Sequence, residues 1–142
     1  MNDLRRKRGF YLTPMSNIIR EIITDRKKGI NAMYSFISDQ TPAKGDIHYW
    51  TRFLNQDTPV FTGAEKIAIK YNMVVVFFNS KKIKRGHYTT TIDVLFEHTT
   101  GLPEHAITEA HVRCLEKNIV EDPQYWIWSH HRWKHKRETL NA

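Results

Sequence analysis

The amino-acid sequence predicts a single α/β domain, in which helices flank a mixed β-sheet. Segments with helical periodicity alternate with apolar, strand-like runs, which is the pattern of an α/β layer fold. The longest apolar run, residues 73–78 (MVVVFF), has the length of a strand and lacks polar alternation, so we expect it in a sheet covered on both faces. With 142 residues, 40% of them hydrophobic, the chain can bury one core.

The first half of the chain begins with a basic lead-in, residues 1–12. Residues 13–29 are predicted to form a helix, because Thr13 or Ser16 can cap it and isoleucines recur on one side. Gly29 follows its basic last turn, where helices commonly end in a left-handed residue. Residues 30–38 are predicted to form a strand that stops at the turn DQTP. The stretch from 43 to 61 is irregular and polar, which predicts a long loop.

The second half continues the alternation. Residues 62–72 predict a helix ended by an asparagine, and residues 73–80 and 87–96 predict two antiparallel strands joined by the turn KKIKRG. Residues 102–122 predict the longest helix, with Pro103 near its start. The expected organisation is therefore an α/β body, residues 13–121, followed by a C-terminal segment rich in Trp, His and Arg, residues 122–142.

Charge and composition limit the classes of partner. The net charge is +7 and the pI about 9.6, so nucleic acid, phosphorylated small molecules, acidic proteins and negative membranes are all candidates. The single cysteine, Cys114, excludes an internal disulfide and a cysteine-based zinc site. No apolar run is long enough to span a bilayer and no signal peptide is recognisable, so we expect a soluble or peripheral protein.

One spacing matches a catalytic pattern. His111 and Glu116 are related as His-x4-Glu, the spacing of a general base and its orienting acid in acyltransferases. Both lie in a predicted helix, where five residues rotate the chain by about 140° from the first side chain, so the pair should diverge. Cys114 lies on the apolar side of the same helix and is expected to be an inert core thiol. The 142 residues therefore predict neither a catalytic centre nor a cofactor site.

The histidines near the C-terminus could suggest a metal. His131 and His135 have an i, i+4 spacing that can bind zinc from a helix. No third ligand is placed by spacing, and the flanking Lys and Arg side chains would repel a cation. We therefore predict a solvated basic tail and no metal.

Aromatic and basic residues are concentrated in the segment YWIWSHHRWKHKRE, residues 125–138. Trp126, Trp128 and Trp133 would be costly to leave in water beside so many cations. This composition is typical of a membrane-interface or lipid-phosphate surface, and equally of a nucleic-acid stacking platform.

Several motifs occur in an order that resembles one family. Residues 123–134, PQYWIWSHHRWK, are similar to a pattern P-x-x-Y-x-W-x-H-x-R-F-K through five residues: Pro123, Trp128, His130, Arg132 and Lys134. The segments SDQTPAKG, TGAEKIAIKYNMVVVFF and RKRG resemble its D-Q-x-P turn, its T-G helix with the following strand, and its basic stretch. Asn55 stands where a glycine is common. The chain resembles the C-terminal portion of bacterial lipid A biosynthesis acyltransferases, the lauroyl/myristoyl transferase family.

This resemblance implies a partial glycerol-phosphate-acyltransferase-like layer fold. It also implies an enzyme of lipopolysaccharide biosynthesis at the cytoplasmic face of the bacterial inner membrane, with acyl carrier protein as donor and a lipid A precursor as acceptor. The family's His-x4-Asp/Glu box and its membrane anchor precede the matched region. We therefore expect Met1 to be internal to a longer reading frame, the N-terminal catalytic part to be missing, and the chain alone to be inactive.

The resemblance also nominates site residues. Arg6 and Arg8 are candidates for holding a phosphate or sugar acid, although solvated surface charge is the favoured interpretation of both. Candidates at the substrate are Asp39, Gln40, Thr62 and Gly63; Asp39 can also be a turn-forming residue. The C-terminal residues Trp126, Trp128, His130, Arg132, Trp133 and Lys134 either face an anionic membrane or form an internal lock. The rival hypothesis, a basic nucleic-acid-binding module, explains the charge but not the ordered motifs.

Overall fold

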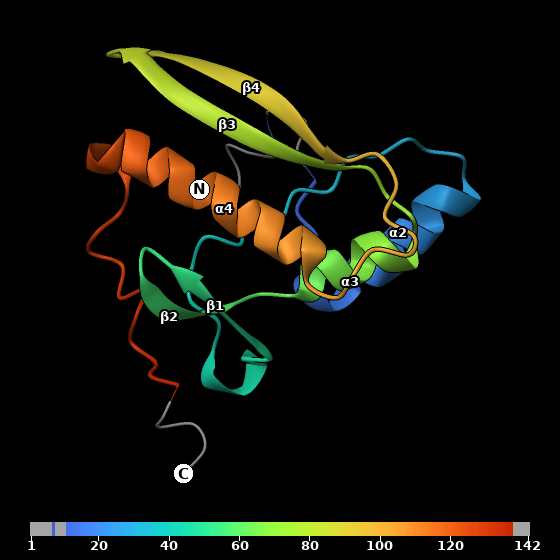
Figure 1. Ribbon diagram of the computed structural model, residues 1–142. Coiled ribbons are helices and arrows are strands. Elements are labelled where there is room, and N and C mark those ends of the chain that lie inside the picture. The colour runs from blue at the N-terminus through green and yellow to red at the C-terminus, as the bar shows by residue number, and fades with distance from the viewer. Residues whose placement is uncertain (1–6, 8–10, 138–142) are drawn as a thin grey trace. The chain divides into compact units, whose positions relative to one another are not determined.

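The computed structural model describes residue 7 and residues 11–137 (Figure 1). The chain divides into two compact units, Met1–Ser35 and Phe36–Ala142.

The first unit is built on one helix. A short 3-10 helix, η1 (Met15–Asn17), leads into α2 (Ile18–Lys27), and Gly29 follows with a φ of +67°, as predicted for the residue that ends the helix. The predicted cap at Thr13 or Ser16 is wrong, because Asn17 is the N-cap and no side chain caps the helix.

The strand predicted over residues 30–38 is also wrong. Residues 30–38 have no regular secondary structure, because the chain turns back at Gly29 and the Ile30 N–H donates to the Asp25 carbonyl at 2.9 Å. The Tyr34 hydroxyl also donates to Asp25, at 2.6 Å, and burial together with this bond raises the pKa of Tyr34 to about 12.

The second unit contains two separate antiparallel hairpins in the described residues, rather than the single mixed sheet expected from the sequence. Strands β1 (Tyr49–Phe53) and β2 (Gln56–Val60) form the first hairpin, just after the 3-10 helix η2 (Lys44–Asp46). The loop predicted for residues 43–61 is therefore wrong. The tight turn of the first hairpin is made by Leu54 and Asn55, which both have a positive φ, as a two-residue hairpin turn of this type requires.

Strands β3 (Val75–Lys84) and β4 (His87–Phe96) form the second hairpin. The sequence predicted both strands, but β3 continues through residues 81–84, which were expected in the turn. Gly86 supplies the left-handed residue at the turn, with a φ of +77°. One expectation is wrong: this hairpin is not covered on both faces. The Phe77 ring packs towards the α4 helix, whereas Phe78, Ile92 and Val94 on the opposite face are exposed.

Two helices complete the second unit. Helix α3 (Gly63–Lys70) ends near Asn72, as predicted, and α4 (Ala106–Glu121) is the longest helix. A 3-10 turn, η3 (Pro123–Tyr125), follows α4. Figure 1 shows α4 running between the β3–β4 hairpin on one side and β1–β2 with α3 on the other.

The core of the second unit lies between α4 and the first hairpin. Its buried centre consists of Phe53, Val60, Val112 and Ile119. Side chains packed around this centre include Tyr49, Leu54, Leu115, Trp126 and Trp133. The last two come from the C-terminal segment, so that segment is part of the core.

Candidate functional site

Arg132 is the centre of the junction between the C-terminal segment, residues 122–137, and the first hairpin. Its side chain is 2% exposed. Its Nη1 donates to the Thr41 hydroxyl at 3.2 Å and to the Pro59 carbonyl at 2.9 Å, and its guanidinium carbon lies 5.7 Å from the centre of the Phe53 ring. The prediction of a solvated basic tail is therefore wrong for Arg132, because these groups replace its water.

Two of the three tryptophans in this segment belong to the same junction. Trp126 and Trp133 lie against Phe53, with ring centres 6.2 and 6.3 Å from it, and the Trp133 indole N–H donates to the Thr58 hydroxyl at 2.8 Å. Trp128 differs, since it is 56% exposed and its indole N–H donates to the Pro123 carbonyl at 2.7 Å. Trp126 and Trp133 thus have the environment of an internal lock, and Trp128 has that of a surface residue.

The D-Q-x-P turn meets the C-terminal segment through Thr41. The Thr41 hydroxyl donates to the Arg132 carbonyl at 2.6 Å and accepts from its guanidinium. The structure therefore brings together two motifs that lie 91 residues apart in the sequence. Asp39 is half-buried at this turn, and Gln40 is exposed beside it.

The junction is electrostatically unusual. Burial lowers the pKa of Arg132 to about 10, and the Asp39 carboxylate opposes this shift. Burial also lowers the pKa of His111 below its ordinary value of 6.5; Asp39 opposes that shift and Arg132 reinforces it. Asp39, His111 and Arg132 are therefore close enough to influence one another's ionisation.

Hydrogen-bonding capacity remains unused at this junction. Within the described residues, the buried side-chain atoms without a hydrogen-bond partner are Asp39 Oδ1, Arg132 Nε and His135 Nε2. All three belong to the two segments that Thr41 joins. Unsatisfied buried polar atoms are uncommon in folded proteins and often mark a functional site.

His111 and Glu116 point to different neighbours, as the helical spacing predicted. The His111 ring lies edge-on to Phe77 of β3, with ring centres 5.8 Å apart. The Glu116 carboxylate instead accepts the Leu54 N–H at 2.6 Å and pairs with Arg113. Arg113 also donates to the Arg52 carbonyl, so Glu116 and Arg113 fasten the β1–β2 turn to α4. His111 and Glu116 therefore do not form a base–acid pair.

The remaining predicted site residues have simpler surroundings. Thr62 is the buried N-cap residue of α3, and Gly63 is the exposed first residue of that helix. His130 is half-buried and Lys134 is exposed. Arg6 and Arg8 lie outside the described residues.

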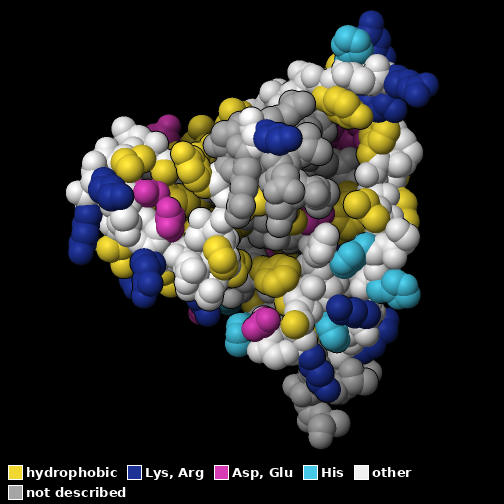
Figure 2. All heavy atoms as spheres, turned by 180° about the vertical axis from the view of Figure 1, so that it is seen from behind, with side chains coloured by type: hydrophobic (Ala, Val, Ile, Leu, Met, Phe, Trp, Pro, Cys, Tyr) yellow, Lys and Arg dark blue, Asp and Glu magenta, His cyan; other side chains and the backbone are white. Residues whose placement is uncertain are grey.

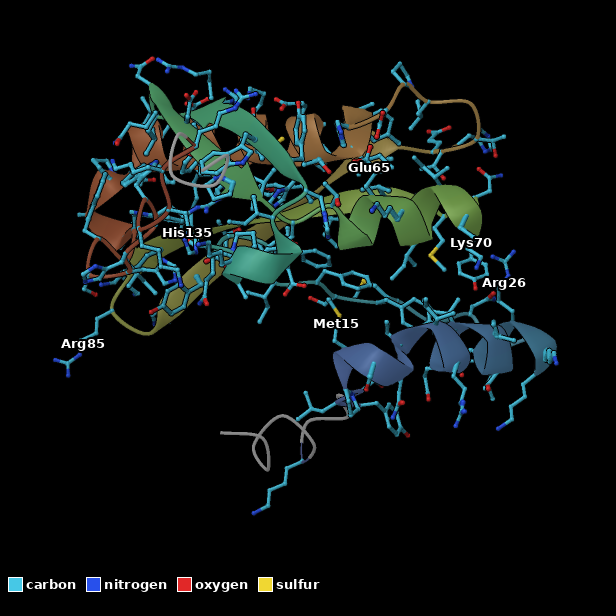
Figure 3. The ribbon with its side chains drawn as sticks, turned by 90° about the horizontal axis from the view of Figure 1, so that it is seen from below. Met15, Arg26, Glu65, Lys70, Arg85 and His135 are labelled. Atoms are coloured by element: carbon cyan, nitrogen blue, oxygen red, sulfur yellow. The ribbon has the colours of Figure 1, made fainter. Side chains whose placement is uncertain are left out.

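Glu65, a buried acid between α3 and α4, was not predicted from the sequence (Figure 3). Its carboxylate accepts the Ile107 N–H at 3.2 Å and the Thr108 hydroxyl, and it lies 3.7 Å from His105 Nδ1. A carboxylate here satisfies one N–H group at the start of α4 and complements the helix dipole. The signal in the sequence was an acid three residues before the apolar Ala68, on the buried face of a short helix.

A shallow hollow of about 160 Å³ lies where the second hairpin, the end of α4 and the C-terminal segment meet. Its lining includes Ser80, Lys81, Asn118, Asp122 and Tyr125. In the described part of the chain no group of three or more His, Cys, Asp or Glu side chains could hold a metal ion. None of the described helices has the length and apolarity needed to cross a bilayer.

A family model described as bacterial lipid A biosynthesis acyltransferase matches residues 1–135. No curated protein and no solved structure shows a significant match. The matched region includes both the Asp39 turn and Arg132.

Proposed function

The chain belongs to the bacterial lipid A biosynthesis acyltransferase family, and from this membership we propose that it forms the acceptor side of an enzyme using acyl carrier protein as donor. The acceptor is a hydroxyl of a lipid A precursor, and the reaction takes place at the anionic inner face of the bacterial inner membrane. The observation that supports this assignment best is the junction of the Asp39 turn with Arg132, because it joins two motifs of the family resemblance around unsatisfied polar atoms.

The reaction requires a base for the acceptor hydroxyl. Once deprotonated, the hydroxyl oxygen attacks the thioester carbonyl, and the carrier's thiol leaves with a proton. His111 and Glu116 cannot serve as the coupled base and acid, because their side chains contact different elements. We therefore propose that the base is supplied from outside these 142 residues and that the isolated chain does not transfer acyl groups.

The Asp39 turn is our candidate for acceptor binding. Arg132 contacts this turn through the Thr41 hydroxyl, and the exposed Gln40 follows Asp39, whose carboxylate has an unused oxygen. Carboxylate and amide groups are suited to the hydroxyls of a sugar acceptor. Arg6 and Arg8 remain candidates for its phosphates. Thr62 and Gly63 remain candidates through the N–H groups of the first turn of α3.

The nucleic-acid alternative loses much of its support. A stacking platform needs exposed aromatic faces. Trp126 and Trp133 use theirs to pack on Phe53.

A genetic experiment tests the proposal. Deleting the gene that encodes this chain should leave lipid A lacking one acyl chain, as measured by mass spectrometry of the extracted lipid. The wild-type gene should restore the missing chain, and a gene carrying Asp39→Asn should restore it poorly. A gene carrying Lys117→Gln, an exposed lysine of α4 that is not among the candidate site residues, is the control and should restore the chain fully. Unchanged lipid A after the deletion would contradict the proposal.

A second experiment addresses the isolated chain. Purified residues 1–142, supplied with acyl carrier protein thioester and lipid A precursor, should give no acylated product. Product formation that His111→Gln abolishes would overturn our assignment of the base.

A further inference from the structure

Exposed apolar side chains and cations gather where the tip of the second hairpin meets the C-terminal segment. We call this region the tip surface; it consists of Lys82, Ile83, Lys84, Arg85, Tyr88, Tyr125, Ile127 and Trp128. Its two parts adjoin, since the Lys82 ammonium lies 5.7 Å from the centre of the Tyr125 ring. Lys81 of the hairpin and Tyr125 also line the same hollow.

The apolar members of the tip surface are unusually exposed. Ile83 and Tyr88 are each 68% exposed and Ile127 is 61% exposed. Trp128 beside Ile127 is held in place, because its indole N–H bonds the Pro123 carbonyl and its backbone N–H bonds the Trp126 carbonyl. An indole fixed outwards in this way, with its polar group already satisfied, is available for an apolar or interfacial environment.

The cations of the tip surface carry uncompensated charge. In the described residues, Lys82, Lys84 and Arg85 form no ion pair, whereas the neighbouring Lys81 is paired with Glu121 at 2.7 Å. Figure 2 shows Lys and Arg side chains gathered at the end of the hairpin, and Figure 3 shows Arg85 pointing away from the rest of the unit. The tip surface is therefore a protruding, positively charged and partly apolar feature.

We propose that the tip surface is the site at which this unit docks on an anionic lipid bilayer. This inference rests on the proposed function, and it moves the lipid contact from Trp126 and Trp133, which are packed, to the hairpin tip and Trp128. Phosphate headgroups complement the three cations, and the interfacial region accepts the indole and isoleucine side chains.

The chemistry favours a bilayer over other anionic partners. Nucleic acid offers stacking faces and phosphates, but it gives protruding isoleucine side chains little to bind. An acidic protein would have to provide a concave apolar pocket for a protruding hairpin turn. A bilayer interface accommodates such a tip without a preformed pocket.

Vesicle sedimentation with the full chain tests the proposal at about 0.15 M salt. The chain should bind vesicles that contain phosphatidylglycerol, and it should bind pure phosphatidylcholine vesicles much more weakly. Lys84→Gln with Arg85→Gln should weaken binding to the anionic vesicles about 25-fold, at about fivefold for each cation. Ile127→Ser with Trp128→Ser should weaken it at least about tenfold.

The matched control is Lys66→Gln with Lys70→Gln, which removes the same charge from α3. Helix α3 packs at the start of α4 through Glu65, whereas the tip surface lies near its end; 16 helical residues span about 24 Å. This control should change vesicle binding less than twofold. Circular dichroism should show that every variant keeps its fold.

Three results would overturn the proposal: equal binding to anionic and neutral vesicles, an equal loss in the α3 control, or tighter binding to a single-stranded oligonucleotide or to polyglutamate than to anionic vesicles. Vesicle binding is measured without acyl transfer. Its failure therefore leaves the proposed reaction untouched, and unchanged lipid A after gene deletion would leave the vesicle result untouched.

Discussion

Arg132 places a full positive charge in the core, and its stability there depends on the oxygens around it. Removing a guanidinium from water is expensive, which is why burial lowers the pKa of Arg132 to about 10. The Thr41 hydroxyl and the Pro59 carbonyl replace part of its hydration, and the guanidinium carbon lies over the Phe53 ring, 5.7 Å from its centre. Since that pKa is still well above neutrality, the side chain remains charged under ordinary conditions.

We expect Arg132→Ala to destabilise the chain by about 3 kcal/mol, because it removes the hydrogen bonds to Thr41 and Pro59 and leaves a cavity. Urea denaturation followed by tryptophan fluorescence measures the loss. The control is Lys134→Ala, an exposed cation two residues later, which should change stability by less than about 0.5 kcal/mol. Equal effects of the two substitutions would show that the buried contacts contribute little.

His111 should make stability depend on pH. Burial lowers its pKa below 6.5, so the unfolded chain binds a proton at this residue more readily than the folded chain does. The free energy of unfolding should therefore fall as the pH drops below 6.5. His111→Gln should flatten this dependence between pH 7 and about pH 5. The exposed His48→Gln serves as control; the same flattening in that variant would contradict the assignment to His111.

The candidate site was only partly predictable from the sequence. The motif resemblance identified Asp39 and Arg132, but spacing alone could not show that residues 91 positions apart share a hydroxyl. A cluster of cations normally indicates solvated charge, and only the tertiary contacts reveal that one member is buried. Glu65 was not predicted for a related reason. A buried carboxylate is stable there only because the start of α4 supplies hydrogen-bond donors to it, and the sequence does not show this contact.

Elements were predicted well where periodicity was strong and local. Both strands of the second hairpin, helix α3 and helix α4 show it, and the structure contains them. The first hairpin was not predicted for two reasons. Pro59 lies inside β2, and proline normally argues against a strand; the turn consists of Leu54 and Asn55, without the glycine that usually marks such a turn. The strand predicted at 30–38 failed because strand-like residues need a neighbouring strand to pair with.

The β1–β2 turn offers a test of backbone strain. Asn55 has a φ of +62°, a conformation that asparagine tolerates and glycine adopts freely. Asn55→Ala should lower stability by about 1 kcal/mol in thermal or urea unfolding, whereas Asn55→Gly should be neutral or slightly stabilising. Gln56→Ala, next to the turn and exposed, is the control.

Glu65 links α3 to the start of α4 through two hydrogen bonds. Glu65→Ala removes the acceptor of the Ile107 N–H and the Thr108 hydroxyl and should cost about 2 to 3 kcal/mol. Hydrogen exchange should show faster exchange of amides in the first turn of α4 and little change at its last turn. A substitution at Lys66, on the exposed side of α3, should leave that exchange unchanged.

At the scale of the second unit, one surface remains apolar. The outer face of the β3–β4 hairpin exposes Phe78, Ile92 and Val94, which follow one another across paired positions of the two strands. The continuous apolar run of β3 led us to expect a strand buried on both faces. The structure instead leaves one face of the hairpin uncovered. Such a face favours association between molecules.

We therefore expect the chain to bind a hydrophobic fluorescent dye and to associate as its concentration rises. Ile92→Thr with Val94→Thr should reduce both effects while preserving the strand, because threonine suits β-structure. Dye fluorescence and analytical ultracentrifugation provide the measurements. Thr89→Ser with Thr91→Ser, on the opposite face of β4, is the control, and an equal reduction in that variant would contradict the expectation.

The bond between Thr41 and Arg132 also constrains the order in which the chain can mature during translation. Arg132, the partner of the Thr41 hydroxyl, is synthesised 91 residues after Thr41. At about 5–20 residues per second, the ribosome needs roughly 5–18 seconds to reach it. For most of that interval Phe53 lacks both of its tryptophan neighbours, because Trp126 precedes Arg132 by only six residues and Trp133 follows it. A nascent chain of this kind should engage chaperones until Trp133 emerges, and then close in a single late step.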